Sequence, residues 1–205
     1  MGVDFIFAIA VLIMSVVIHE VSHGYSAYML GDSTAKYAGR LTLNPLKHLD
    51  LFGSVIVPLL LVLTKAGFIF GWAKPVPYNP YNLKNQKWGP AVVGAAGPAS
   101  NFFMALVFGL VLRFGMGTFL PASSVDIIVL IVFINLLLGI FNLIPIPPLD
   151  GSKLLFALLP YKWQHIQHSL ERYGFFMLLF FIFFLWRFLI PVILVLFKLI
   201  TGIAF

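Results

Sequence analysis

Four long apolar runs dominate the chain, and each is long enough to cross a bilayer as a helix. They cover residues 3–29, 91–112, 125–144 and 173–200. Because a spanning helix needs about 20 apolar residues, these runs predict an all-α polytopic membrane protein with about four to six transmembrane helices. The last run contains Arg187 and Pro191, so it can form one long tilted helix or two shorter ones.

The chain between the first two runs has a different pattern. Residues 34–43 partly alternate between polar and apolar side chains around Gly39, which predicts two short strands of a membrane-associated β-hairpin. The apolar stretch 51–63 is short for a span and contains Pro58, which fits a re-entrant or tilted segment; with residues 68–70 added, the stretch could also cross. Residues 71–90 contain four prolines and are predicted to form a structured loop.

Composition supports a membrane protein and limits its chemistry. Of the 205 residues, 61% are hydrophobic and 10% are charged, whereas about a quarter of a soluble domain is charged. We therefore expect residues 1–205 to form a single integral-membrane domain. The net charge of +6 does not indicate nucleic-acid binding, because the basic residues lie in loops beside apolar runs, where they contact lipid headgroups. The absence of cysteine excludes thiolate zinc ligands and a cysteine nucleophile.

The positions of the basic residues predict the orientation of the helices. Ten of the thirteen Lys and Arg residues fall within 36–47, 65–87 and 153–172, and none lies within 114–124. If the three basic regions face the cytoplasm, the first run crosses inward, the second outward and the third inward again. This topology brings the polar groups of the three runs to one depth, towards the cytoplasmic side.

Three ionisable side chains lie inside the first run: His19, Glu20 and His23. Two histidines four residues apart share a helix face and can bind one ion. Glu20 lies about 100° around the helix from His19, where it can reach a metal-bound water without being a ligand. Buried His and Glu are costly in lipid without a partner. The spacing therefore predicts a catalytic zinc site in which Glu20 is the general base.

A catalytic zinc needs a third protein ligand and one open position. The candidates are His48, Asp50, Asp126, Asp150, His165, His168 and Glu171. The charge argument puts Asp126 on the wrong side, and His165 and His168 lie on a basic amphipathic stretch typical of headgroup contact. Asp150 follows a Pro-Pro pair at the end of the third run, where a broken helix can present a carboxylate to the interior. It can equally cap the next helix, and the residues alone leave both roles open.

Polar amides also interrupt two of the runs. Asn101 follows a stretch of small residues from Gly94 in the second run, and Asn135 and Asn142 lie in the third. Small residues allow neighbouring helices to approach closely. A buried amide must find a hydrogen-bond partner in the bilayer, so each of these asparagines is expected to contact another polar group.

Three separate motifs together resemble the site-2 protease family of intramembrane zinc metalloproteases, in its compact prokaryotic form without a PDZ domain. The motifs are His19–His23, Gly97–Asn101 and Asn142–Gly151. The resemblance implies that His19, His23 and Asp150 bind one zinc ion and that Glu20 activates a water molecule. It also implies that Asn142 lies near the site and orients or polarises the scissile peptide; Asn101 is a second candidate for that role.

The family resemblance also implies partners and location. Substrates would be single-span membrane proteins, cleaved within or near the spanning segment in a prokaryotic cell membrane, with the active site towards the cytoplasm. A substrate helix must unwind before attack, and the predicted strands in 34–43 could bind the unwound segment by β-augmentation. Two alternatives remain: a zinc transporter or channel, which needs no Glu20, and a non-catalytic zinc-stabilised scaffold, against which the intact motif argues.

Overall fold

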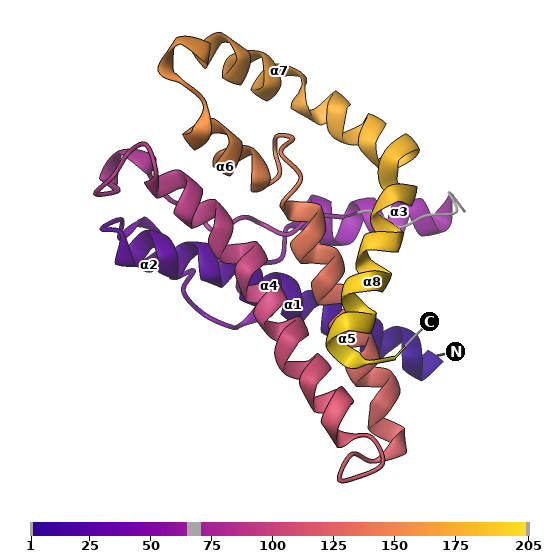
Figure 1. The fold of residues 1–205 in the computed structure, drawn as a ribbon. Helices are drawn as coiled ribbons and strands as arrows, with labels where there is room; N and C mark the ends of the chain where they lie inside the picture. Colours follow the sequence, from indigo (N-terminus) through magenta and orange to yellow (C-terminus); the bar gives the residue numbers. More distant parts are fainter. Residues whose placement is uncertain (1, 65–70, 204–205) are drawn as a thin grey trace.

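The structure is a computed structural model that describes residues 2–64 and 71–203, and within those ranges the chain forms helices and loops but no strand. The elements in chain order are α1 (Gly2–Met29), α2 (Thr34–Tyr37), η1 (Pro45–Lys47), η2 (Leu51–Ile56), α3 (Val57–Leu63), η3 (Pro80–Asn82), α4 (Gly89–Gly115), α5 (Ala122–Asn142), α6 (Gly151–Leu158), η4 (Tyr161–Trp163), α7 (Gln164–Phe180), η5 (Phe181–Leu185), η6 (Trp186–Phe188) and α8 (Leu189–Thr201). Figure 1 shows their arrangement.

Four helical stretches in the described part of the chain are long and apolar enough to cross a membrane, as the sequence predicts. They are Ile6–Met29, Gly89–Gly115, Ala122–Asn142 and His165–Thr201. Helices α1, α4 and α5 pack side by side, and α8 packs against α4 and α5. The protein is therefore a multi-pass, all-helical membrane protein built around these helices.

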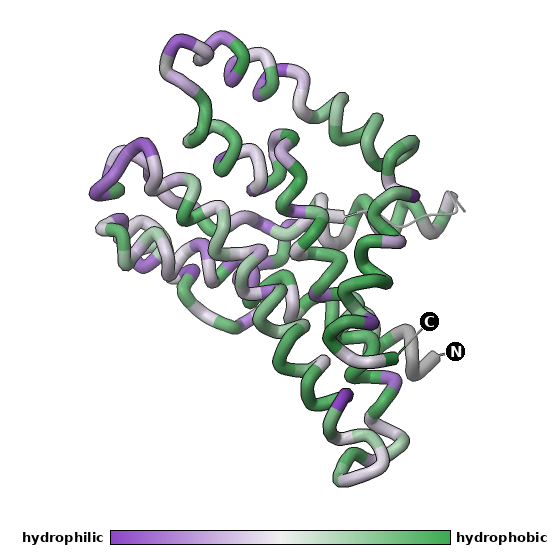
Figure 2. Tube along the Cα trace, in the orientation of Figure 1, coloured by the Kyte–Doolittle hydropathy of each residue, from purple (hydrophilic) through white to green (hydrophobic). Residues whose placement is uncertain are grey.

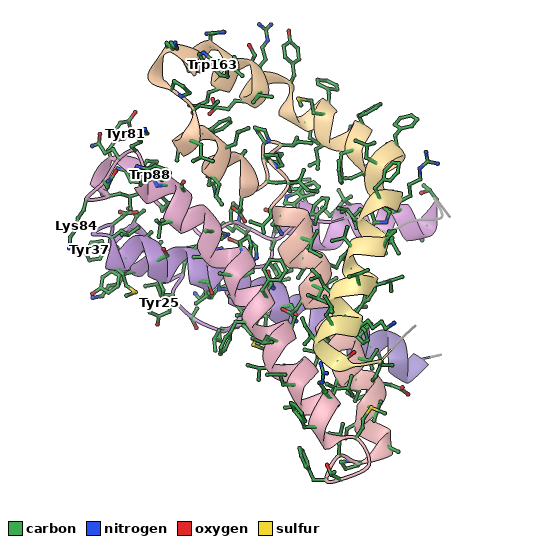
Figure 3. All side chains as sticks on the ribbon, viewed as in Figure 1. Tyr25, Tyr37, Tyr81, Lys84, Trp88 and Trp163 are labelled. Atoms are coloured by element: carbon green, nitrogen blue, oxygen red, sulfur yellow. The ribbon has the colours of Figure 1, made fainter. Side chains whose placement is uncertain are left out.

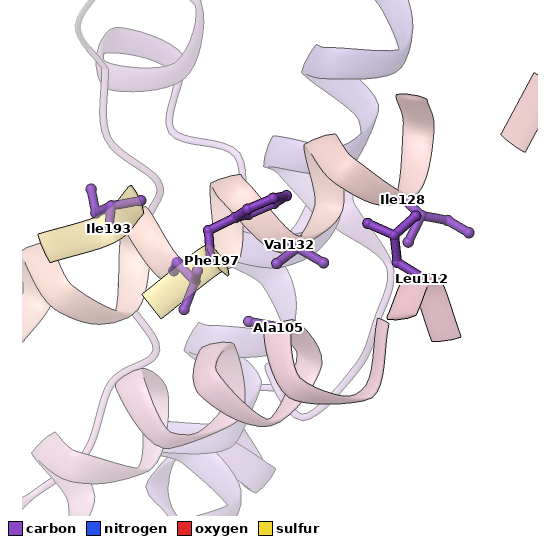
Figure 4. Packing of buried hydrophobic residues seen from close by; sticks show 7 residues of the cluster. Ala105, Leu112, Ile128, Val132, Ile193 and Phe197 are labelled. Atoms are coloured by element: carbon purple, nitrogen blue, oxygen red, sulfur yellow. The ribbon is translucent and has the colours of Figure 1, made fainter. Parts of the chain in front are cut away.

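One interior of the bundle is entirely apolar. Its buried residues come from α4, α5 and α8 and are Ala105, Leu112, Ile128, Val132, Leu136, Ile193 and Phe197. Phe197 is 1% exposed and lies over Val132 and Ala105 in Figure 4. The absence of a side chain at Gly109 brings α4 close to α8, because a Cβ there would lie 2.4 Å from Cγ2 of Ile200. We call the seven buried residues from Ala105 to Phe197 named above the apolar cluster.

The predicted β-hairpin at 34–43 is wrong. Residues Thr34–Tyr37 form the short helix α2 instead, because the buried carboxylate of Asp32 accepts hydrogen bonds from the Thr34 N–H and hydroxyl and so starts a helical turn. Gly39, with φ of 63°, ends that turn. Burial raises the pKa of Asp32, but hydrogen bonds from Thr34, Asn82 and Asn79 outweigh it and hold the pKa below its usual value.

The segment between α1 and α4 lies against the end of α1. The described part of the predicted re-entrant stretch is helical, with six residues in η2 and seven in α3; residues 65–70 of that stretch lie outside the described residues. Residues 71–79 form no helix or strand, and several of their backbone N–H groups bond to other parts of the chain. The Trp72 N–H donates to Gly53, the Lys74 N–H to His48 and the Asn79 N–H to Asp32.

The last apolar run forms a bent helical stretch. Helix α7 leads into a π-helical turn, η5, and a 3-10 turn, η6, before α8 begins. In Figure 1, α7 lies apart from α1, α4 and α5, and α8 lies beside α5. The sequence left open one long helix or two shorter ones, and the structure has a single path with an irregular bend.

Polar residues gather at one end of the molecule. In Figure 2 the hydrophilic residues concentrate around α2, the start of α4 and the connection between α6 and α7. Figure 3 shows Tyr37, Tyr81, Lys84 and Trp88 together at that end, and Tyr37 and Tyr81 are 86% and 81% exposed. Aromatic and lysine side chains favour the boundary between membrane and water. We call this end the aromatic end.

Candidate metal centre

Helix α1 places the two histidines of the H-E-x-x-H motif on its inner face. His19 and His23 are 5% and 7% exposed, and their ring centroids are 4.7 Å apart. Their Nε2 atoms approach to 3.0 Å. The i and i+4 spacing thus produces the convergence expected of two ligands to one ion.

Asp150 completes the cluster from a distant part of the chain. It directly precedes α6, but its side chain makes no capping hydrogen bond to that helix. Its Oδ2 atom lies 3.0 Å from His19 Nε2 and 3.1 Å from His23 Nε2 instead. Within the described residues, these three side chains are the group of His, Asp or Glu with metal-binding spacing. The geometry therefore favours the ligand role for Asp150 over the capping role.

The donor atoms fit a zinc ion. Atoms bound to one tetrahedral zinc at about 2.0–2.1 Å lie roughly 3.3 Å apart, and the three sides of this triangle measure 3.0, 3.0 and 3.1 Å. Nδ1 of His23 is 2.6 Å from the Val93 carbonyl oxygen, to which it donates, so Nε2 of His23 carries a lone pair. Acceptor atoms facing one another at this distance repel unless a cation lies between them.

The neighbouring helix leaves room for these atoms at Gly97. A Cβ added there would lie 2.5 Å from Nε2 of His23 and 2.6 Å from Nε2 of His19. Glycine at position 97 is therefore required by space and not by backbone conformation. This explains why a stretch of small residues in α4 faces the motif in α1.

A chain of buried polar side chains extends from His19 across three helices. Nδ1 of His19 donates to Oδ1 of Asn101 at 2.6 Å, Nδ2 of Asn101 donates to Oδ1 of Asn135 at 2.9 Å, and Nδ2 of Asn135 donates to the Ser15 hydroxyl at 2.9 Å. Asn101 and Asn135 are both 0% exposed. We call Ser15, Asn101 and Asn135 the polar chain. It fixes the tautomer of His19 and directs its Nε2 towards Asp150 and His23.

The side chain of Asn101 is bonded to protein groups on both sides. It is fully buried and supports His19, and a role towards a substrate stays a prediction. Sequence reasoning identified Asn135 as a polar residue in a span but not its connection to His19, and it missed Ser15. A serine in an apolar helix, one turn before His19, was the available signal.

Asn142 is the last residue of α5, and Glu20 follows the first histidine within α1. Nδ2 of Asn142 donates to the Leu138 carbonyl at 3.0 Å, within its own helix, so its role towards a substrate stays a prediction. Glu20 is half-buried, and its Oε2 accepts a hydrogen bond from the Val76 N–H at 2.8 Å. The segment 71–79 thus holds the carboxylate beside the first histidine.

The other candidate ligands lie elsewhere. The Nε2 of His48 donates to the Thr42 carbonyl at 2.9 Å, and Oδ1 of Asp50 caps η2 through the Gly53 N–H. His168 and Glu171 approach one another at 3.8 Å on α7 and are largely exposed. Asp126 and His165 are exposed as well. Among the described residues, none of these groups joins the cluster of His19, His23 and Asp150.

Comparison with known proteins gives consistent matches. The model of peptidase family M50 matches residues 117–185. "Putative zinc metalloprotease YwhC" of Bacillus subtilis is 40% identical over 175 residues, which are 82% of this chain and 76% of that protein. "Putative zinc metalloprotease Rip2" of Mycolicibacterium smegmatis is 32% identical over 174 residues, 83% of this chain and 64% of that protein. No solved structure matches the chain.

Proposed function

The chain belongs to peptidase family M50, the site-2 protease family, and from this premise we propose that it is an endopeptidase acting inside the membrane. As a member it is a multi-pass membrane metalloprotease that uses zinc. We propose that it hydrolyses peptide bonds within or near the transmembrane segments of single-span membrane proteins. The observation that carries the proposal is the triangle formed by His19, His23 and Asp150, buried in a bundle of spanning helices.

The role that we propose for each residue follows from its contacts. His19, His23 and Asp150 are the zinc ligands, and bound zinc would polarise the scissile carbonyl and lower the pKa of a water molecule at the open position. Glu20 is the general base. Its Oε2 is held by the Val76 N–H, so its Oε1 is the atom that takes the proton from the water and passes it to the leaving nitrogen.

The aromatic end supports a location of the site near one membrane surface. The ends of α1 and α4 that carry His23 and Val93 lie towards Tyr37, Tyr81 and Trp88, whose exposed rings are typical of a membrane–water boundary. Together with the basic loops, this favours a site that opens to the cytoplasm in a prokaryotic cell membrane. Water for hydrolysis is scarce in the bilayer centre and available at that depth.

Substitution of Glu20 tests the proposal. The purified protein is reconstituted in liposomes with a single-span reporter, and cleavage and bound zinc are measured for wild type, Glu20→Gln and the control Glu171→Gln, whose carboxylate is exposed on α7. We expect Glu20→Gln to retain zinc and lose cleavage, because the amide cannot accept the proton, while Glu171→Gln cleaves normally. Wild-type cleavage by Glu20→Gln contradicts the mechanism. Zinc flux without cleavage in the same liposomes favours a transporter.

A further inference from the structure

The two oxygens of the Asp150 carboxylate have different partners. Oδ2 faces both imidazoles, at 3.0 and 3.1 Å. Oδ1 points the other way and accepts a hydrogen bond from Nζ of Lys153 at 2.9 Å. Lys153 lies three residues along the chain, in the first turn of α6. A charge-assisted bond of this length fixes the rotation of the carboxylate as well as its position.

Lys153 is itself held in place by two other elements. Its Nζ lies 5.6 Å from the ring centroid of Tyr78, which belongs to the segment 71–79 that also binds Glu20. On its other side is Gly94 of α4, where an added Cβ would lie 3.0 Å from both Cβ and Cδ of Lys153. The side chain of Lys153 is 29% exposed. Gly94 thus makes room for Lys153, as Gly97 makes room for the two histidines.

The pairing matters because a carboxylate can bind zinc through one oxygen or two. A catalytic zinc has three protein ligand atoms and keeps its fourth position for water or substrate. If Oδ1 of Asp150 were free, it could turn towards the metal and fill that fourth position. The ammonium group of Lys153 occupies Oδ1 and so opposes that turn.

We propose that Lys153 is a positioning residue of the metal centre: by holding Oδ1 of Asp150, it restricts this ligand to Oδ2 and keeps the fourth coordination position open. The inference rests on the proposed zinc site, and it predicts properties of the metal that do not depend on any peptide substrate. Loss of the lysine should change the coordination number of the metal and weaken its binding. Arginine, which is also cationic and can donate to Oδ1, should preserve both.

The test uses cobalt in place of zinc, because the visible absorption of Co²⁺ is stronger in four-coordinate than in five- or six-coordinate sites. Wild type, Lys153→Met, Lys153→Arg and the control Lys162→Met are purified in detergent, loaded with Co²⁺ and titrated with a chelator. Lys162 is a good control because it is exposed, nine residues along the chain. We expect Lys153→Met to have weaker absorption and roughly 10-fold lower metal affinity, the scale on which outer partners of ligands act. Lys153→Arg and Lys162→Met should match the wild type.

The outcomes separate the two proposals. Wild-type absorption and affinity in Lys153→Met overturn the role of Lys153 and leave the zinc site intact. An Arg variant that behaves like Met also overturns it, because a second cation would then fail to hold the carboxylate. Absence of stoichiometric Co²⁺ in the wild type contradicts the metal centre and the proposed function together. Lys153→Gln, which keeps a polar side chain without the charge, replaces the Met variant if that protein aggregates, with the same direction expected.

Discussion

Helices α4 and α5 contribute to two interiors that differ in almost every respect. Near the histidines, Asn101 and Asn135 belong to the polar chain and are joined by directional hydrogen bonds. One turn further along α4, Ala105 belongs to the apolar cluster, whose buried side chains are all hydrophobic. Lipid tails are as apolar as leucine side chains, so burying leucine between helices instead of in lipid gains little free energy. Burial alone therefore does not fix the register between spanning helices. The polar chain fixes the register of α1, α4 and α5, because its hydrogen bonds can form in one register only.

The contrast predicts that substitutions near the histidines change metal binding, whereas substitutions in the apolar cluster change stability. The largest effect is expected from Asp150→Ala, which removes a ligand and leaves two imidazoles. We expect it to lose about one zinc per chain and all cleavage, since two neutral ligands do not form a catalytic zinc site. Metal analysis of the purified protein measures this, with the exposed Asp126→Ala as control. Full zinc content in Asp150→Ala would exclude Asp150 as the third ligand.

Gly97→Ala is the next sharpest test, because it adds one methyl group to the polar interior. The new Cβ would lie 2.5 Å from Nε2 of His23 and 2.6 Å from Nε2 of His19, so one or both rings must move. We expect a loss of zinc affinity of about 10-fold or more, the scale seen when ligands are misplaced. Zinc affinity is measured by chelator competition. Ala99→Leu adds more bulk at an exposed position of the same helix and should bind zinc normally.

The polar chain predicts a graded effect with distance from the metal. Asn101→Leu leaves the buried Nδ1 of His19 without its acceptor, at a cost of about 1–3 kcal/mol, and we expect zinc affinity to fall about 10-fold. Asn135→Leu removes the next residue, so the fall should be smaller. Zinc titration of both variants measures the gradient. Equal affinities for Asn135→Leu and Asn101→Leu would show that the chain acts as one unit and not stepwise.

Phe197→Ala addresses the apolar cluster and should affect the metal least. Removal of a buried aromatic ring costs about 3 kcal/mol or more of stability through the cavity that remains. We expect a lower unfolding temperature in detergent and an unchanged zinc affinity in the protein that stays folded. Thermal unfolding and zinc titration are measured on one preparation. A large fall in zinc affinity would mean that the two interiors are coupled, against the separation drawn above.

The sequence predicts the spans and the histidines well because both depend on local patterns. Run length determines whether a helix can cross, and the spacing of His19 and His23 follows from helix geometry alone. The alternation of side chains at 34–43 predicts strands that do not form, because the carboxylate of Asp32 starts a helical turn there. A single acidic residue just before a short segment decided its structure.

Contacts between distant parts of the chain could not be read from the sequence. The role of Asp150 depends on where the chain turns between α5 and α6, and that of Asn101 depends on which residue of α1 lies opposite. Lys153 lies in the first turn of α6, and nothing local in the sequence indicates that the carboxylate before it faces away from that helix. These roles come from the packing of α4 between α1 and α6, which the sequence alone does not state.

The glycine at position 97 limits which substitutions the protein can tolerate. Every amino acid other than glycine carries a Cβ, and any Cβ at this position would lie within 2.6 Å of both imidazole nitrogens that face the cluster. No missense change of this codon is therefore expected to be silent in phenotype. A residue without a side chain is thus under selection for the space that it leaves to the two imidazoles.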